Sequence, residues 1–271
     1  MRYKMVFESE KDNLLNGQIA YLLSRAVGQI FLPNEVLNRF HHGGKDQVVN
    51  QFVHSKIFSR DHKVIRDSKH GSVRHYFSDP IWVFVSSNHP EILGYWEHLR
   101  SADEPLIMTI GEHAYRLVNA EQQEFFYEDR SGNSLMEISG ITMSPVIFYD
   151  SMRVNDKQYK KCYSVFDQDP VVSKRITELF RSNIYKKVKA TGMHLSKDML
   201  NQCQLEVREG KARKVVVPYK GGYYDGFEGD FVLKAPANIA KMLWDLGIGP
   251  LGSSGFGMWD AVPKISDLVG A

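Results

Sequence analysis

Two groups of residues have the types and spacing that chemistry needs, and they lie far apart in the sequence. Residues 247–252 read GIGPLG, which is the G-x-G-x-x-G spacing of a dinucleotide-binding loop. Residues 40–45 read FHHGGK, so that His41 and His42 precede two glycines and Lys45. Histidine suits proton transfer because its unperturbed pKa, about 6.5, lies close to neutral pH. The sequence therefore offers a candidate phosphate loop and candidate proton-transfer groups.

The surroundings of the glycine run argue against a nucleotide cofactor. A dinucleotide-binding loop follows a strand and opens a helix, so that the pyrophosphate meets the helix N-terminus. Here a predicted helix at 237–246 comes first, a predicted strand follows, and only fourteen residues remain after Gly257. No Lys-Ser or Lys-Thr pair follows the glycines to complete a P-loop. We therefore predict no cofactor.

A longer motif contains these glycines: Gly-x-Gly, five residues, then Gly-x-Gly, at residues 247–257. Glycine permits positive φ and close approach of other segments, and consecutive free N–H groups can bind an anion. The preceding helix ends here and its dipole disfavours anions, so phosphate binding would depend on the loop's own amides and two serines. In the alternative, the glycines serve only a tight helix-to-strand connection. The candidate binding positions are Gly247, Gly249, Ser253, Ser254, Gly255 and Gly257.

Positive charge is concentrated in the second half of the chain, although the whole protein carries a formal charge of only +2. Residues 181–220 contain ten basic residues and three acidic ones. A local excess of this size is typical of a polyanion-binding surface, or else of a solvated basic face. The candidates lie at the end of a predicted helix and on a predicted hairpin: Lys186, Lys187, Lys189, Lys211, Arg213 and Lys214.

Composition limits the class of protein. The 271 residues, 43% of them hydrophobic, suffice for one large domain or two smaller ones. The only two cysteines, Cys162 and Cys203, form no C-x-x-C pair and indicate a reducing compartment. No apolar run approaches about 18 residues, so we expect a soluble, cytoplasmic protein with no membrane contact. The ten histidines show no H-x-x-x-H spacing, and we predict no metal site.

Hydrophobic periodicity predicts the element order β-α-β-β-α-β twice. This order is typical of two ferredoxin-like domains, each an antiparallel sheet with helices on one face, in the α+β class. We place the domains at residues 1–125 and 126–271, with the boundary in the polar run 119–133. The predicted strands are 3–8, 51–58, 81–87, 106–118, 138–149, 202–219, 223–235 and 255–262, and the main helices are 13–31, 89–99, 171–188 and 236–246.

The position of the glycine motif, between the last helix and the last strand of such a chain, resembles the signature loop of the RAMP superfamily of CRISPR-associated proteins. Three further stretches resemble the branch that processes CRISPR repeat RNA. RFHHGG followed by QFVHSKIFS is similar to its Leu-His-x-x-Gly segment and the strand after it. ITMSPVIF is similar to its Ser-Pro-Ile/Val element, and ELFRSNIYKKV to its Asn-Leu-x-x-Lys helix, with Asn183 and Lys187 matching. The ordered set spans nearly the whole chain.

This resemblance implies an endoribonuclease that needs no metal. The 2′-hydroxyl attacks the adjacent phosphate, leaving a 2′,3′-cyclic phosphate and a free 5′-hydroxyl. His41 matches the family's motif histidine and is implied as general acid or general base, with His42 as the alternative if the turn is shifted by one residue. Lys45 lies near the family's charge-stabilising lysine, although its spacing differs.

The first helix departs from the family pattern, because many members place a tyrosine base where this sequence has Arg25 and Ala26. Tyr21 and Arg25 share one helical face. Tyr21 could act as base and Arg25 could hold the phosphate, or both are simply exposed. His54 is expected to be structural or a minor RNA contact.

The implied partner is CRISPR repeat RNA, as precursor and processed guide, with an effector complex or a homodimer as further assemblies. The basic hairpin would lie along an RNA stem, and Tyr219, Tyr223 and Tyr224 would stack on bases or serve packing. One alternative is a non-catalytic RAMP protein that binds repeat or guide RNA in an effector complex. Another is a general RNA-binding ferredoxin-like protein, which is disfavoured because neither half has an aromatic RNP-type strand.

Overall fold

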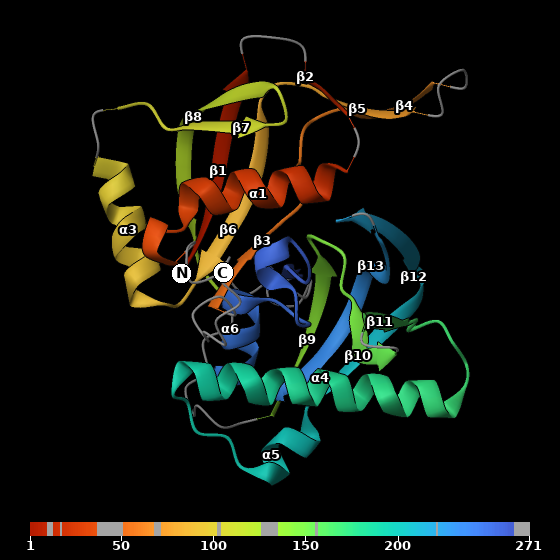
Figure 1. Ribbon diagram of the computed structural model, residues 1–271. Coiled ribbons are helices and arrows are strands. Elements are labelled where there is room, and N and C mark those ends of the chain that lie inside the picture. The colour runs from red at the N-terminus through yellow and green to blue at the C-terminus, as the bar shows by residue number, and fades with distance from the viewer. Residues whose placement is uncertain are drawn as a thin grey trace, which may run out of the picture.

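The computed structural model consists of two stacked α+β units (Figure 1). It describes residues 1–271 except 10–12, 17, 37–50, 68–71, 102–103, 126–134, 155–156, 221 and 263–271. Among the described residues, no helix is both long enough and apolar enough to cross a membrane. The same residues include no group of three or more His, Cys, Asp or Glu side chains that could hold a metal ion.

The first unit is built on a five-stranded sheet with the order β3-β6-β1-β8-β7. All neighbouring strands in this sheet are antiparallel. In the chain, α1 precedes β3, and α3 connects β6 to β7. A separate three-stranded sheet, β2-β5-β4, extends from this unit. Its elements are β1 (Arg2–Ser9), β2 (Asn13–Asn16), α1 (Ile19–Phe31), β3 (Phe52–His54), β4 (His62–Asp67), β5 (Ser72–Phe77), β6 (Ile81–Ser87), α3 (Pro90–Ser101), β7 (Ile107–Ile110) and β8 (His113–Gln123).

The second unit has a four-stranded sheet with the order β12-β13-β9-β14 and a separate ribbon, β10-β11. With β9, α4, β12, β13, α6 and β14 taken as the six core elements, this is the ferredoxin-like order, which the first unit shares. Its elements are β9 (Leu135–Thr142), β10 (Phe148–Val154), β11 (Lys157–Tyr163), α4 (Pro170–Thr191), α5 (Lys197–Gln202), β12 (Gln204–Tyr219), β13 (Gly222–Pro236), α6 (Ala237–Leu246), the 3-10 turn η2 (Gly252–Ser254) and β14 (Trp259–Ala261).

The repeated ferredoxin-like order is confirmed, but several predicted elements have different bounds. The predicted strand 106–118 is a hairpin, because Gly111 with φ +62° turns the chain between β7 and β8. The predicted helix 13–31 starts only at Ile19, since residues 13–16 pair with β5 as strand β2. The predicted strand 51–58 is regular only over Phe52–His54.

Each unit has its own hydrophobic core, and charged groups join the two. Arg2 of β1 is 1% exposed. Its guanidinium lies 3.7 Å from the ring centroid of Trp244 and donates to the Trp244 carbonyl. Asp260 accepts hydrogen bonds from Arg2 at 3.4 Å and from the Trp244 indole at 2.9 Å. Burial lowers the pKa of Arg2 to about 10, so the group stays cationic at neutral pH and joins the units.

The predicted domain boundary falls between β8, which ends at Gln123, and β9, which begins at Leu135. Phe125, the last residue of the predicted first domain, lies 5.5 Å from Trp244 of the second unit, measured between ring centroids. The division at residues 125 and 126 stays a proposal.

Candidate functional site

The glycine loop, residues 247–257, connects α6 to β14 and lies against β3 and α1 of the first unit (Figure 1). A Cβ atom on Gly257 would overlap the carbonyl of Ile248, and one on Gly255 would overlap the ring of His54. Positive φ, which favours glycine, occurs at all four glycines of the motif: Gly247, Gly249, Gly255 and Gly257. The motif therefore fixes a backbone shape and a close contact with β3.

Several amides of the loop already donate to protein carbonyls. The N–H groups of Ile248 and Gly257 donate to the carbonyls of Gly257 and Pro145 at 2.7 and 2.8 Å. The amides of residues 254–256 donate to carbonyls of residues 251 and 252, and the amide of Met258 donates to Ser144 Oγ. Of the predicted positions, Ser254, Gly255 and Gly257 have amides that already donate to protein acceptors.

The predicted binding residues of the loop differ in how far they are exposed to solvent. Ser254 is 9% exposed and the four motif glycines are buried, so they serve packing rather than a ligand surface. The residues of the loop that reach solvent are Pro250, Leu251 and Ser253, which are half-buried. Of the predicted positions, only Ser253 lies where a ligand could touch its side chain.

His54 lies beneath the loop as a structural residue. It is 1% exposed, and its Nδ1 lies 2.8 Å from the Ser55 carbonyl oxygen. A carbonyl only accepts, so Nδ1 carries the proton, while Nε2 has no hydrogen-bond partner among the described residues. Burial lowers the pKa of His54 to about 4, so the ring is neutral and makes a flat support for Gly255.

Helix α1 brings the first unit to the loop. Its apolar stripe, including Leu23, Val27 and Phe31, is buried in the first core, which turns its polar face outward. Ser24 Oγ lies 3.3 Å from the Ser253 carbonyl oxygen and 3.3 Å from the Tyr219 hydroxyl. One side chain thus contacts both the glycine loop and the β12–β13 hairpin.

Two predicted residues flank Ser24 on the same helix. Tyr21 is half-buried, and its ring meets that of Tyr219 edge-on at 5.5 Å. Arg25 is exposed, with its guanidinium 5.9 Å from the centroid of the Tyr21 ring. The structure therefore brings Tyr21 and Arg25 to the edge of the loop.

Aromatic rings continue from α1 across the loop to β10, in a series that we call the aromatic row. Successive ring centroids are 5.5, 5.5, 5.9 and 6.3 Å apart, in contacts that are edge-on or tilted. Lys160 of β11 lies at one end, 4.6 Å from the centroid of one ring, and donates to a tyrosine hydroxyl at 3.0 Å. Tyr219 and Phe256 are buried, so only the half-buried rings of the row, together with Lys160, could stack on bases and hold phosphates. The row is Tyr21, Tyr219, Phe256, Tyr224 and Tyr149.

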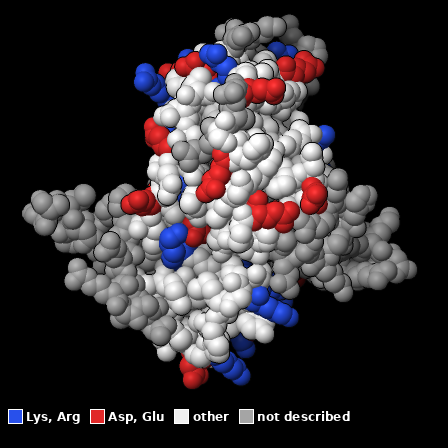
Figure 2. Space-filling view, turned by 90° about the vertical axis from the view of Figure 1, so that its left-hand side faces the viewer, with Lys and Arg blue, Asp and Glu red and all other residues white. Residues whose placement is uncertain are grey.

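The basic residues predicted on the hairpin do lie on β12, but two of them are paired. Arg213 contacts Glu228 at 3.1 Å and Lys214 contacts Asp225 at 2.7 Å, both acids being on β13. Lys211 is exposed at the bulge that follows Gly210, whose φ is +73°. Figure 2 shows mixed charge over the first unit and mainly basic side chains over the second unit on the face that it presents.

The three lysines predicted at the end of α4 divide between surface and interior. Lys186 and Lys189 are exposed, as expected. Lys187 is 3% exposed, and its Nζ donates to the Leu246 carbonyl at 2.9 Å. Burial lowers the pKa of Lys187 to about 7. The prediction that Lys187 binds a polyanion at the surface is therefore wrong, since it closes the C-terminal end of α6.

The candidate proton-transfer residues His41, His42 and Lys45 lie outside the described residues. The sequence reasoning missed Ser24, Lys160, Tyr149 and Phe256. A signal existed for the lysine only, because a Lys-Lys pair at 160–161 lies in a polar stretch before a predicted helix.

Comparison with known proteins agrees with the fold. Residues 129–261 match a family model described as CRISPR associated protein Cas6, C-terminal. No curated protein matches the chain. A solved RAMP protein, described as binding different RNA substrates, is 17% identical with a TM-score of 0.73, covering 97% of this chain and 100% of its own.

Two further solved structures are similar over the same length. The product of a Cas6-related gene from Pyrococcus furiosus is 17% identical with a TM-score of 0.70, covering 97% of this chain and 99% of its own. A Cas6 product complex is 15% identical with a TM-score of 0.57, covering 97% and 100%. At these identities the similarity establishes a shared tandem ferredoxin-like fold.

Proposed function

From the premise that the chain belongs to the Cas6 family of CRISPR-associated proteins, we propose that it cuts CRISPR precursor RNA within each repeat to generate guide RNAs. The observation that carries this proposal is the meeting of α1 with the glycine loop at Ser24 and Ser253. At this contact Tyr21 of the first unit, with Arg25 beside it, meets Tyr219 of the second. RNA complexes among the similar structures support an RNA substrate.

The proposed reaction needs no metal ion. The 2′-oxygen attacks the adjacent phosphorus while its proton passes to a base, and the bond from phosphorus to the 5′-oxygen breaks as an acid protonates that oxygen. The products are a 2′,3′-cyclic phosphate and a 5′-hydroxyl. Because the nucleophile is already attached to its target, the protein must mainly align the strand, move protons and stabilise charge.

The residues proposed for these roles follow the family resemblance. His41 acts as general acid or base, with His42 as the alternative, and Lys45 stabilises charge on the phosphorane. Tyr21 is the proposed base on α1, where its half-buried ring leaves the hydroxyl without a protein partner among the described residues. Arg25, exposed one turn later, supplies positive charge for the phosphate.

The test is incubation of end-labelled repeat RNA with the protein in EDTA. Cleavage to products that end in a cyclic phosphate is expected, and RNA with a 2′-deoxyribose at the cut site should stay intact. Tight binding without cleavage would instead favour the alternative function, a non-catalytic RAMP protein that binds repeat or guide RNA in an effector complex. The RNA-binding description of the similar RAMP protein supports that alternative.

A further inference from the structure

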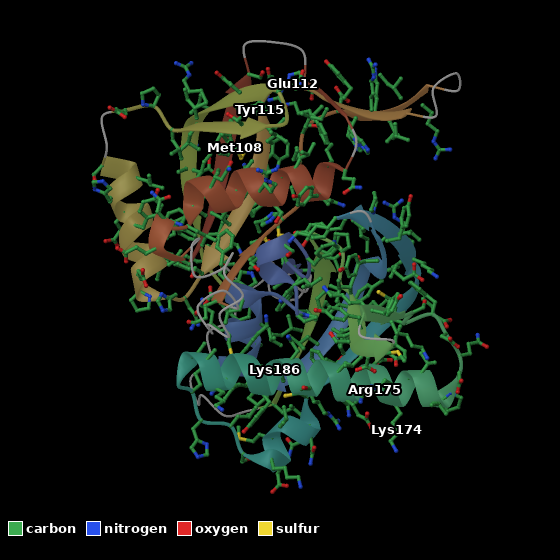
Figure 3. All side chains as sticks on the ribbon, in the orientation of Figure 1. Met108, Glu112, Tyr115, Lys174, Arg175 and Lys186 are labelled. Atoms are coloured by element: carbon green, nitrogen blue, oxygen red, sulfur yellow. The ribbon has the colours of Figure 1, made fainter. Side chains whose placement is uncertain are left out.

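A pocket of about 290 Å³ lies between β10, α4 and the glycine loop. Pro250 of the loop, Tyr149 of β10 and Asn183 of α4 all line it. Figure 3 shows Arg175 and Lys186, which also line it, on α4 below β10. The pocket therefore adjoins the proposed cleavage site but is formed within the second unit.

Asn183, which lines one wall of the pocket, has a polar atom that the described part of the protein does not use. Asn183 is 8% exposed, and its Oδ1 has no hydrogen-bond partner in the described part of the chain. Buried polar atoms in folded proteins are nearly always paired, because leaving one unpaired is unfavourable. Four residues later on the same helix, Lys187 is satisfied by the Leu246 carbonyl. The unpaired amide of Asn183 thus indicates a ligand that supplies its own donor.

The other walls suit a flat aromatic ligand. Phe148 is 1% exposed and Tyr149 is half-buried, and both line the pocket. Tyr149 is also the last member of the aromatic row, through its contact with Tyr224 at 6.3 Å. Tyr219 and Phe256 of the row are 5% and 1% exposed, so a base next to the pocket could contact only Tyr149 and its neighbour Tyr224.

Charge at the pocket is available from only one of its two basic residues. Arg175 is occupied by Asp150, whose Oδ2 lies 2.8 Å from its Nε, and by Glu178 at 2.8 Å. Lys186 is exposed and has no acidic partner among the residues that the structure describes. A ligand with its ring inside the pocket could place a phosphate at Lys186.

We propose that this pocket holds a single unpaired adenine of the bound RNA, as a specificity pocket of the proposed nuclease; this inference rests on the proposed function. Because Asn183 Oδ1 is itself buried, the side-chain amide turns toward the pocket on binding. Its Oδ1 then accepts from the adenine N6 amino group and its Nδ2 donates to N7, a pairing that asparagine makes with adenine in other complexes. Tyr149 contacts the base, and Lys186 binds the phosphate. Unpaired RNA bases are commonly recognised by stacking and edge contacts of this kind.

The test uses the intact protein and labelled eight-residue oligouridylates that carry one adenosine, guanosine or cytidine at a central position. The wild type is expected to bind the adenosine oligomer about tenfold more tightly than the others. Asn183→Asp should lose this preference and favour guanosine, because a carboxylate only accepts and guanine offers two adjacent donors. Asn201→Asp, the same change at an exposed residue of α5, should retain the adenosine preference. Equal binding of all oligomers by the wild type would overturn the proposal.

Two further measurements test the proposal independently of the Asn183→Asp variant. If Asn183→Asp does not fold, the wild type is tested with 7-deazaadenosine in the oligomer, and unchanged affinity would overturn the N7 contact. Adenosine monophosphate tests the other source of the same chemistry, and binding of it without the oligomer would contradict an RNA site. Repeat cleavage is assayed in parallel. Cleavage without an adenosine preference would contradict only the proposed adenine pocket, whereas an adenosine preference without cleavage would contradict only the proposed nuclease function.

Discussion

The first helices of the two units, α1 and α4, occupy the same position in the same fold but serve different surfaces. α1 lies at the junction and turns Tyr21 and Ser24 toward the other unit. α4 lies along the second unit away from α1 (Figure 1) and buries Asn183 and Lys187 within it. The same position in the topology therefore does not decide what a helix does. That depends on which part of the protein its polar face meets.

The two helices also differ in how their ends are capped. α4 carries its own boundary signals: Asp169 accepts from the Val171 amide, Pro170 opens the first turn, and Gly192 closes the last with φ +68°. At the start of α1, Gln18 makes no capping bond with its side chain. The position of α1 thus depends on packing against its neighbours, including the glycine loop. We expect the first unit to supply chemistry and the second to supply binding.

The largest expected effect concerns the segment after α1. We expect His41→Ala to slow cleavage of repeat RNA by roughly 10²–10⁴-fold, which is the typical contribution of a general acid or base, while binding of the RNA stays nearly unchanged. Single-turnover cleavage and equilibrium binding would measure both. His194→Ala, which removes an exposed histidine of the second unit, is the control and should cleave normally. A fully active His41→Ala variant would contradict the proposal that His41 acts as general acid or base.

A smaller effect is expected from the buried lysine of α4. Its pKa is about 7 in the folded protein, against about 10.4 for lysine in an unfolded chain. Between these values the unfolded chain holds a proton that the folded chain lacks, so stability rises with pH from about 7 to about 10. Below pH 7 the cost of burying the charge is present in full.

Lys187→Met should remove this contribution, lowering the pH slope of the unfolding free energy by up to about 1.4 kcal/mol per pH unit. Urea unfolding at pH 7, 8.5 and 10 measures it. Lys186→Met, a neighbouring and exposed position on α4, should keep the wild-type slope. Equal slopes in the two variants would mean that Lys187 is not buried as a neutral amine.

The smallest effect is expected on the hairpin. Glu228 contacts both Arg213 and Lys56, at 3.1 and 3.0 Å. Glu228→Gln should free both cations, tighten RNA binding a few-fold at low salt, and steepen the dependence of log affinity on log salt by about 1. Glu137→Gln, which releases only Lys234 from an exposed pair, is the control and should change the slope less. An unchanged slope after Glu228→Gln would place the RNA elsewhere.

The sequence predicted the fold well because period and order are properties of the chain itself. The prediction failed where the partner of a residue is distant in sequence. Asp225 and Glu228, which pair with the basic strand β12, lie on β13, outside the segment whose charges were counted. Lys187 was predicted to be exposed, like its neighbour Lys186, because the position of a residue in a helix does not by itself reveal which other element covers it.

The glycine motif shows the same limit. Its glycines do take the positive φ that glycine permits, but the acceptors of its amides, such as the Pro145 carbonyl for Gly257, are visible only in the structure. Asn183 was noticed only as part of a motif, and its unpaired oxygen is visible only in three dimensions. Local pattern therefore predicted the order of elements, whereas the burial and pairing of Lys187 and Asn183 depend on residues distant in sequence.

The contact between Ser24 and Ser253 spans 229 positions of the chain, and this fixes an order of events during synthesis. At a translation rate of about 5–20 residues per second, the second serine is made roughly 10 to 50 s after the first. Through that interval the nascent first unit exposes Ala20 and Tyr21, which later pack beside Phe256. The glycine loop thus covers a helix that was made more than 200 residues earlier.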